Sequence, residues 1–147
     1  MTHSEQPTVL VVDDDVDCAQ SLCDLLGELG CCVQARHDGR SAVEAAVVLR
    51  PALMIVDLAL GSEDGCRLMN TIRDLLPPGD RPVMVCLTGR ADPRTELECL
   101  QQGFDLFLAK PLITEALHEV LAVAASRRRW RPQANLAVRS RPLPPPG

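Results

Sequence analysis

Several polar residues of this sequence directly follow short apolar runs, at the positions where buried strands would end. The runs are Val9–Val12, Leu53–Val56, Val83–Leu87 and Leu106–Ala109, and the residues that follow them are Asp13, Asp14 and Asp15, then Asp57, Thr88 and Lys110. In an open parallel sheet, ligands bind outside the carboxyl ends of the strands. We therefore expect carboxylates, a hydroxyl and an ammonium group to meet at one edge of such a sheet.

Carboxylates that lie this close together repel one another unless protons or a cation neutralise them. These positions offer oxygen ligands without His or Cys, and such a set predicts a hard cation, Mg²⁺ first. Beside Mg²⁺, the carboxylate of Asp57 could attack phosphorus and form an acyl phosphate, with Thr88 and Lys110 contacting the phosphoryl oxygens. Taken singly, each residue could instead cap a helix or lie in a turn, so the prediction depends on all of them together.

The segments between these runs have the periodicity of amphipathic helices. Apolar residues recur at helical spacing over Ala19–Leu29, Ala42–Leu49, Leu68–Leu76, Leu97–Leu100 and Leu117–Ala124, and Cys31–Ala35 forms one more apolar run. We expect Asp92-Pro93 to start the fourth helix and Thr114 to cap the fifth. Five strand–helix repeats predict an α/β fold with a five-stranded, mainly parallel sheet, helices on both faces and right-handed crossovers.

Composition indicates a globular chain and excludes several classes of protein. Of the 147 residues, 46% are hydrophobic and 24% are charged. No apolar run approaches the roughly 20 residues of a membrane span, and the polar residues 1–7 do not resemble a secretory signal. We expect a cytoplasmic protein whose seven Cys are reduced and act mostly as small hydrophobic residues. Only the adjacent pair Cys31 and Cys32 is a candidate for redox chemistry.

Charge is distributed unevenly along the chain. Residues 126–147 hold six of the 15 basic residues and none of the 20 acidic ones, so the rest is strongly acidic. An acidic body argues against nucleic-acid binding by the folded part. We predict an N-terminal extension (1–7), a folded domain (8–125) and a disordered basic tail (126–147). Trp130 among the arginines leaves open that the tail docks on an acidic partner or an anionic membrane surface.

Together, these motifs resemble the receiver domains of bacterial two-component response regulators. The similarity extends over about residues 8–125 and depends on VLVVDDD at 9–15, MIVDLAL at 54–60, Asp64-Gly65, CLTG at 86–89 and FDLFLAKPL at 104–112. The resemblance implies a flavodoxin-like (CheY-like), doubly wound fold with strand order 2-1-3-4-5. It also implies a phosphorelay signalling module, not an enzyme, that accepts a phosphoryl group from a sensor histidine kinase or a histidine phosphotransfer protein.

The resemblance further implies a role for each site residue. Asp57 would be the phospho-acceptor, and Asp13, Asp14 and Asp57 would bind Mg²⁺ together with the backbone carbonyl of Ala59, Asp14 directly and Asp13 partly through water. Thr88 would be the switch hydroxyl and Lys110 the phosphate-binding lysine. Phe107 would be the switch aromatic, with a plain core residue as the alternative. The peptide bond between Lys110 and Pro111 would be cis.

In such a domain, phosphorylation would shift a population of conformations. Thr88 would move toward the phosphate, Phe107 would turn into the vacated space, and the surface over residues 93–124 would change. No DNA-binding or catalytic domain is expected past residue 125, so the output would be contact with a downstream protein target. A homodimer through residues 93–124 is an open possibility.

Three positions depart from the family's pattern. Gly61 stands where relatives often have Pro, which predicts a looser loop before Asp64. Ala59 is small and apolar where many relatives have a polar side chain, and Arg90 is bulky and cationic. We expect Ala59 and Arg90 to tune the lifetime of the phosphate.

The same residues leave other functions open. A Mg²⁺-dependent phosphohydrolase of the haloacid dehalogenase type would carry its nucleophile after the first strand in a D-x-D-x-[TV] pattern. Here that frame gives Asp13, Asp15 and then Asp17, so the last position fails. A receiver-like interaction module that does not take phosphate is a further alternative. A nucleotide-binding Rossmann domain is disfavoured because acids, not a Gly-rich loop, follow the first strand.

Overall fold

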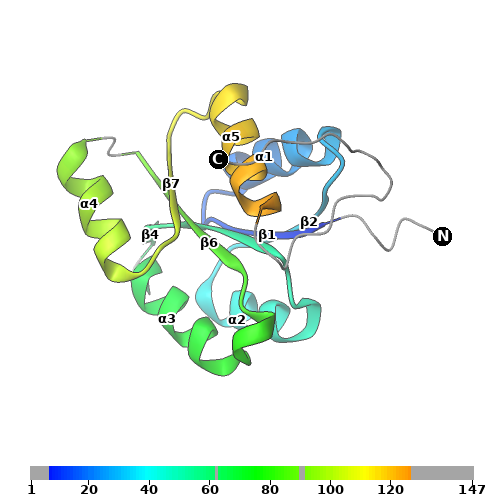
Figure 1. Ribbon diagram of the computed structural model, residues 1–147, viewed down its shortest axis with the longest axis vertical. Helices are drawn as coiled ribbons and strands as arrows, with labels where there is room; N and C mark the ends of the chain where they lie inside the picture. Colours follow the sequence, from blue (N-terminus) through cyan, green and yellow to red (C-terminus); the bar gives the residue numbers. More distant parts are fainter. Residues whose placement is uncertain (1–6, 62, 90–91, 127–147) are drawn as a thin grey trace.

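The apolar runs form the five strands of one parallel sheet. A computed structural model describes residues 7–61, 63–89 and 92–126 (Figure 1). The sheet has the order β2-β1-β3-β6-β7, and every neighbouring pair is parallel. Its strands are β1 (Thr8–Val12), β2 (Cys32–Arg36), β3 (Leu53–Asp57), β6 (Val83–Thr88) and β7 (Leu106–Ala109). Counted along the chain, these are strands 2-1-3-4-5, so the expected fold class and strand order are confirmed.

Helices follow the sheet strands, and a short hairpin follows β3. The helices are α1 (Val16–Glu28), α2 (Gly39–Leu49), α3 (Gly65–Leu75), α4 (Pro93–Gln102) and α5 (Thr114–Ala125). The hairpin consists of β4 (Ala59–Leu60) and β5 (Glu63–Asp64), which pair antiparallel. A 3₁₀ turn, Pro78–Asp80, precedes β6. Asp residues cap the first four helices, each accepting a hydrogen bond from an N–H of the first turn.

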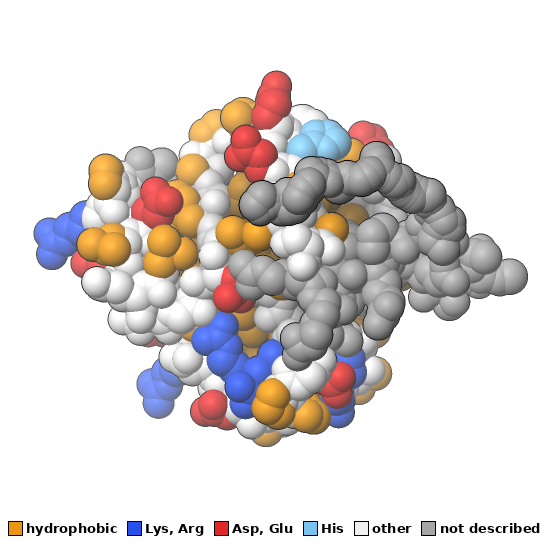
Figure 2. All heavy atoms as spheres, viewed as in Figure 1, with side chains coloured by type: hydrophobic (Ala, Val, Ile, Leu, Met, Phe, Trp, Pro, Cys, Tyr) orange, Lys and Arg blue, Asp and Glu red, His pale blue; other side chains and the backbone are white. Residues whose placement is uncertain are grey.

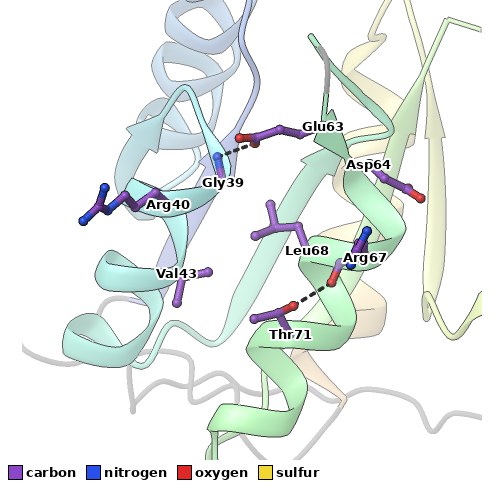
Figure 3. A pocket seen from close by; sticks show the side chains of 8 residues that line it. All are labelled: Gly39, Arg40, Val43, Glu63, Asp64, Arg67, Leu68 and Thr71. Atoms are coloured by element: carbon purple, nitrogen blue, oxygen red, sulfur yellow. Dashed lines mark hydrogen bonds between the residues drawn. The ribbon is translucent and has the colours of Figure 1, made fainter.

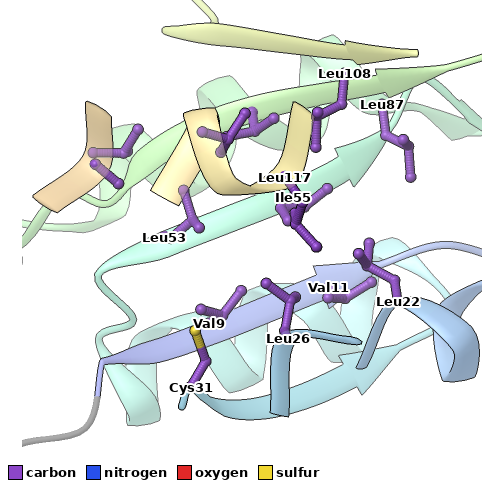
Figure 4. Close-up of a cluster of buried hydrophobic side chains, with 14 of the residues drawn as sticks. Val9, Val11, Leu22, Leu26, Cys31, Leu53, Ile55, Leu87, Leu108 and Leu117 are labelled. Carbon is purple, nitrogen blue, oxygen red and sulfur yellow. The ribbon is translucent and has the colours of Figure 1, made fainter. Parts of the chain in front are cut away.

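The core consists of two apolar layers, one on each face of the sheet. Helices α1 and α5 cover one face, and α2 and α3 cover the other (Figure 1). Side chains that point to opposite faces alternate along each strand. Thus Val9, Val11 and Ile55 pack under α1 and α5 (Figure 4), whereas Leu10, Met54 and Met84 pack toward α2 and α3. Strands β3 and β6 are buried throughout, as expected for central strands of a parallel sheet.

The structure differs from the sequence prediction at three places. Thr114 does not cap α5; it is the first helical residue, because the N–H of Leu117 already donates to the carbonyl of Ile113, and the helix has no side-chain cap. The second strand begins at Cys32 rather than Cys31. The apolar stripe predicted for the fourth helix is solvent-exposed, since Leu97 is 56% and Leu100 41% exposed. Instead, Cys99 is the buried residue of α4.

All seven cysteines are free. Cys31 is buried, which raises the pKa of its thiol to about 11, whereas Cys32 is exposed. A thiol with such a pKa is almost entirely protonated at neutral pH, so the structure gives no support for redox chemistry at Cys31. Cys86 on β6 and Cys99 on α4 meet inside the core, with their sulfur atoms 2.8 Å apart.

None of the helices described is both long and apolar enough to cross a membrane. Hydrophobic side chains are nonetheless visible between charged ones on the face seen in Figure 2. The largest exposed fractions belong to Val48 on α2, Val16 at the start of α1 and Ile113 before α5.

Candidate functional site

Three carboxylates meet at the carboxyl edge of the sheet. Asp57 is the last residue of β3, and Asp13 directly follows β1, which pairs in register with β3. Ligand oxygens of Asp13, Asp14 and Asp57 all lie within 4.8 Å of one another. Asp13 and Asp57 are buried, and Asp14 is exposed. The predicted meeting of these distant segments is therefore found in the structure.

Neighbouring backbone groups hold Asp13 in place. Its Oδ1 accepts a hydrogen bond of 3.0 Å from the N–H of Asp15, and its own N–H donates to the carbonyl of Arg36. Its carbonyl lies 2.9 Å from Nδ1 of His37, the residue that follows β2. Asp15 in turn caps α1 by accepting from the N–H of Cys18. The turn between β1 and α1 is thus fixed on both sides.

Asp57 is held through both of its carboxylate oxygens. Oδ1 accepts a hydrogen bond of 3.0 Å from the N–H of Ala59, and Oδ2 accepts one of 3.1 Å from Nζ of Lys110. The start of α3 packs directly on the backbone here: a Cβ on Gly65 would lie 2.6 Å from the carbonyl oxygen of Asp57. A glycine at position 65 is therefore required for this close approach.

Lys110 links two of the three acids. Its Nζ lies 3.1 Å from Oδ2 of Asp57 and 3.4 Å from Oδ2 of Asp13. Partial burial acts to lower the pKa of Lys110, but the hydrogen bond and charge of Asp57, with those of Asp13, outweigh it and raise the pKa above its usual value. The ammonium group therefore stays charged at neutral pH. The peptide bond that follows, to Pro111, is cis, as the resemblance implied.

The environment of Asp13 fits a bound cation. Burial, together with the neighbouring charge of Asp57, raises the pKa of this carboxyl, while the N–H of Asp15 and the charge of Lys110 oppose the shift. Its Oδ2 is buried and makes no hydrogen bond, although Lys110 lies at ion-pair distance. A buried carboxylate oxygen without a hydrogen bond is costly unless a cation lies near it. The all-oxygen donor set matches the preference of Mg²⁺.

The two predicted switch residues lie near this edge. Asp57 pairs with Leu87 in register, so Thr88, which ends β6 and is buried, lies one residue further along the adjacent strand. Phe107 lies on β7, where it pairs with Cys86 of β6. It is partly buried and packs against the layer that contains Phe104. Ala59, whose carbonyl is a predicted ligand, is exposed on β4.

The sequence argument missed three contacts around the site: that of His37 with Asp13, the close approach of Gly65 to Asp57, and the hydrogen bond of 2.7 Å that Glu63 accepts from the N–H of Gly39. His37 directly follows β2, so the rule that selected residues after strand ends would have found it had β2 been included. Glu63 and Gly65 carry no such signal, because their contacts depend on the path of the hairpin. Arg90, Trp130 and the rest of the predicted basic tail beyond Ser126 lie outside the described residues.

A groove of about 540 Å³ opens beside Lys110. It runs between α1 and the segment after β7, and Ser21 and Leu25 lie on one side of it, with Pro111 and Leu112 on the other. It therefore borders the residue that contacts Asp57.

Comparisons with known proteins identify the family of the chain. The family model described as "Response regulator receiver domain" matches residues 9–122. Among curated proteins, the chain is 34% identical over 121 residues to the sensor histidine kinase RcsC of Salmonella typhi, covering 82% of this chain and 12% of that protein. It is 33% identical over 126 residues to the response regulator MprA of Mycobacterium avium, covering 85% and 53%. The chain thus spans only a part of these relatives.

Solved structures show the same fold. A putative response regulator from Chloroflexus aurantiacus aligns with a TM-score of 0.74 and 26% identity, covering 83% of this chain and 99% of the other. The chemotaxis protein CheY4 of Vibrio cholerae aligns with a TM-score of 0.73 and 25% identity, covering 81% and 98%. Because the family model matches most of the chain and the solved structures share its fold, the chain belongs to the family of response regulator receiver domains.

Proposed function

We propose that this protein accepts a phosphoryl group on Asp57, in a Mg²⁺-dependent reaction, from a sensor histidine kinase or a histidine phosphotransfer protein. The observation that carries the proposal is the position of Asp57: buried at the end of β3, hydrogen-bonded to Lys110, and within 4.8 Å of two further carboxylates. Receiver domains are signalling modules, and the site has the parts that phosphoryl transfer needs, namely a positioned nucleophile and nearby positive charge.

The reaction follows from these contacts. An oxygen of Asp57 forms a bond to phosphorus while the bond between phosphorus and the histidine nitrogen of the donor breaks, and the departing imidazole keeps or takes up a proton. Lys110, already beside Oδ2 of Asp57, neutralises the phosphoryl oxygens. Asp13, Asp14, Asp57 and the carbonyl of Ala59 would hold Mg²⁺, which supplies further positive charge at these oxygens. Thr88, on the neighbouring strand, would donate a hydrogen bond to one of them.

Labelling with a small phosphodonor tests this proposal. Wild-type protein incubated with phosphoramidate and Mg²⁺ should gain one phosphoryl group that is labile to acid and base and sensitive to hydroxylamine, seen by intact mass. Asp57→Asn should abolish the gain, and chelation of Mg²⁺ should do the same. Asp15→Asn is the matched control, because Asn can still cap α1 and Asp15 is not among the three clustered acids. Label that persists in Asp57→Asn but is lost in Asp13→Asn would instead support the phosphohydrolase alternative.

The switch roles of Thr88 and Phe107 belong to the same proposal. Phosphorylation gives Thr88 a new hydrogen-bond acceptor, and movement of Thr88 would open space next to β7, into which Phe107 can turn. Thr88→Ala should therefore still be phosphorylated but should lose most of the phosphorylation-dependent chemical-shift changes on α4 and β7. Unchanged shift differences in that variant would argue against the switch.

We further propose that the phosphodonor protein docks in the groove beside Lys110. The groove is lined in part by Lys110, whose ammonium group donates a hydrogen bond to Asp57, so a partner seated there would lie next to the acceptor site. Ser21 is exposed in α1, so Ser21→Arg fills the groove without removing core packing. This variant should slow phosphotransfer from a kinase that labels the wild type, and leave labelling by phosphoramidate unchanged. Equal rates from the kinase would exclude the groove.

The output surface is proposed to lie on residues 93–124. Leu97 and Leu100 on α4, Ile113 and Val123 are all more than one-third exposed. Such side chains suit contact with a downstream protein or a second copy of the chain. Sedimentation of phosphorylated and unphosphorylated protein would show whether a homodimer forms.

The seven free thiols fit a reducing compartment, so we place the protein in the cytoplasm.

A further inference from the structure

The hairpin after the phospho-acceptor lies between the acidic site and the start of α2. It pairs Ala59 with Asp64 and Leu60 with Glu63. One of its strands begins beside Asp57, through the hydrogen bond from the N–H of Ala59, and the other leads into α3. The position of the hairpin therefore determines where the backbone of Ala59 lies relative to the three acids.

At its turn, the hairpin approaches Asp14. Gly61 has φ +59°, and a Cβ added there would lie 3.2 Å from Oδ2 of Asp14. The ring of Pro, which holds φ near −65°, is incompatible with this backbone. Gly61 thus follows a path that relatives with Pro cannot take, and this path brings backbone against a carboxylate of the site. Strands β4 and β5 pair on either side of this turn.

Glu63 ties the hairpin to α2. Its Oε1 accepts a hydrogen bond of 2.7 Å from the N–H of Gly39, the first residue of α2 (Figure 3). A Cβ on Gly39 would lie only 2.6 Å from this oxygen, so a larger residue at position 39 would require the Glu63 side chain to shift. The N-terminus of a helix has unsatisfied N–H groups and a partial positive charge, which favour a carboxylate here.

The same turn also supports the other side of the site. Two residues before Gly39, Nδ1 of His37 lies 2.9 Å from the carbonyl oxygen of Asp13. The turn of residues 37–39 is therefore linked on one side to the segment that carries Asp13 and Asp14, and on the other, through Glu63, to the hairpin that carries Ala59 and Gly61. It connects the two segments that have to be held at a fixed separation around a cation.

We propose that Glu63 is a positioning residue for the cation site, which acts through its hydrogen bond to Gly39 and not through its charge. The hydrogen bond holds the hairpin against Asp14 and so raises the affinity for Mg²⁺. This inference rests on the proposed function, since it presumes that the three acids bind Mg²⁺.

Calorimetric titration of the unphosphorylated full chain with Mg²⁺ tests the inference. Glu63→Ala removes the hydrogen bond and should weaken Mg²⁺ binding by about threefold to tenfold, the effect of one lost hydrogen bond. Glu63→Gln keeps an acceptor oxygen without the charge and should stay within about twofold of wild type. Glu96→Ala, which removes an exposed acid in the first turn of α4, controls for the change of net charge.

A second variant breaks the same contact from the other side. Gly39→Ala keeps the Glu63 carboxylate but forces it to shift away from the N–H of residue 39, and should weaken Mg²⁺ binding in the same direction as Glu63→Ala and by no more. The double variant should be no weaker than Glu63→Ala alone, because both substitutions act on one interaction. The amide of residue 39 should also exchange faster with solvent in Glu63→Ala.

The outcomes separate this inference from the proposed function. If wild type binds Mg²⁺ and Glu63→Ala binds it equally well, the positioning role is refuted while the proposed function stands. If Glu63→Gln is as weak as Glu63→Ala, charge rather than the hydrogen bond is responsible, and the inference is wrong. If wild type shows no Mg²⁺ binding at all, both fail.

Discussion

The interior of the sheet and its carboxyl edge are both buried, but they are built from opposite chemistry. The interior is formed by apolar side chains in two layers, several of them fully inaccessible to solvent. At the edge, the buried side chains are Asp13, Asp57 and Thr88, and within the described part of the chain these are the buried polar or charged residues. Burial of apolar surface stabilises the fold, whereas burial of carboxylates opposes it. The comparison indicates that the apolar layers stabilise the fold, whereas the buried carboxylates at the edge do not.

The largest expected effect comes from a substitution in the interior, which should lower the free energy of unfolding without weakening Mg²⁺ binding. Leu117 on α5 is fully buried, so Leu117→Ala should lower the free energy of unfolding by about 2 to 5 kcal/mol. Val123→Ala, at a 37% exposed position on the same helix, should cost roughly 0.5 kcal/mol. Urea denaturation measures both values. Under conditions where Leu117→Ala remains folded, its Mg²⁺ affinity should equal that of wild type; a parallel loss of affinity would mean that the two regions are not separable.

At the edge, Mg²⁺ itself should stabilise the protein. A ligand that binds only the folded state adds about 2.7 kcal/mol at one hundred times its Kd. Thermal or urea unfolding with and without Mg²⁺ checks this shift. Asp14→Asn is the informative variant, because Asp14 is exposed and its loss should leave the metal-free fold almost unchanged while abolishing the stabilisation. Equal stabilisation of Asp14→Asn would show that Mg²⁺ acts elsewhere.

Asp13 is buried, so its substitution, unlike that of Asp14, should change the stability of the metal-free protein. In the absence of metal, Asp13→Asn should raise the free energy of unfolding by about 1 kcal/mol, because it removes a buried negative charge beside Asp57, although it also removes a proposed metal ligand. The pKa of Asp13 is raised in the folded state above its usual 3.8, so the folded protein binds this proton more tightly than the unfolded chain does.

Because the pKa of Asp13 is raised by folding, the stability of the protein should depend on pH. Wild-type stability should fall, through this group, as the pH rises from 3.8 through the folded-state pKa. The advantage of Asp13→Asn should be complete above that pKa and disappear below 3.8. Denaturation in the presence of a chelator across this range measures the difference. A variant that is less stable than wild type at neutral pH would show that Asp13 stabilises the edge instead.

Sequence reasoning located this edge because parallel topology forces it. If the apolar runs form neighbouring parallel strands, the residues that follow them lie at the same edge of the sheet, whatever their side chains are. Asp13, Asp57, Thr88 and Lys110 were predicted in this way. The difference between buried Asp13 and exposed Asp14 was not predictable, since two adjacent carboxylates have the same pattern and only the course of the backbone separates them.

Helix faces and loop contacts were harder to predict for a related reason. The apolar period of α4 identified a helix, but Leu97 and Leu100 lie outside the core and Cys99 lies within it. Periodicity shows that a stripe exists, whereas the angle at which a helix packs decides which stripe is buried. The hydrogen bond from Gly39 to Glu63 depends in turn on the path of a two-stranded hairpin, which no repeating pattern encodes.

The smallest expected effect lies on α4 and sharpens the comparison at its boundary. Leu97 is 56% exposed, so Leu97→Ala should change the free energy of unfolding by less than about 0.5 kcal/mol, whereas a Leu inside the core would cost several times more. Urea denaturation at two protein concentrations checks this value. A cost that is large and grows with protein concentration would mean that a second copy of the chain covers this surface in solution. A negligible cost at both concentrations leaves α4 attached chiefly through Cys99, which is the loose attachment that a helix needs if the state of Asp57 is to move it.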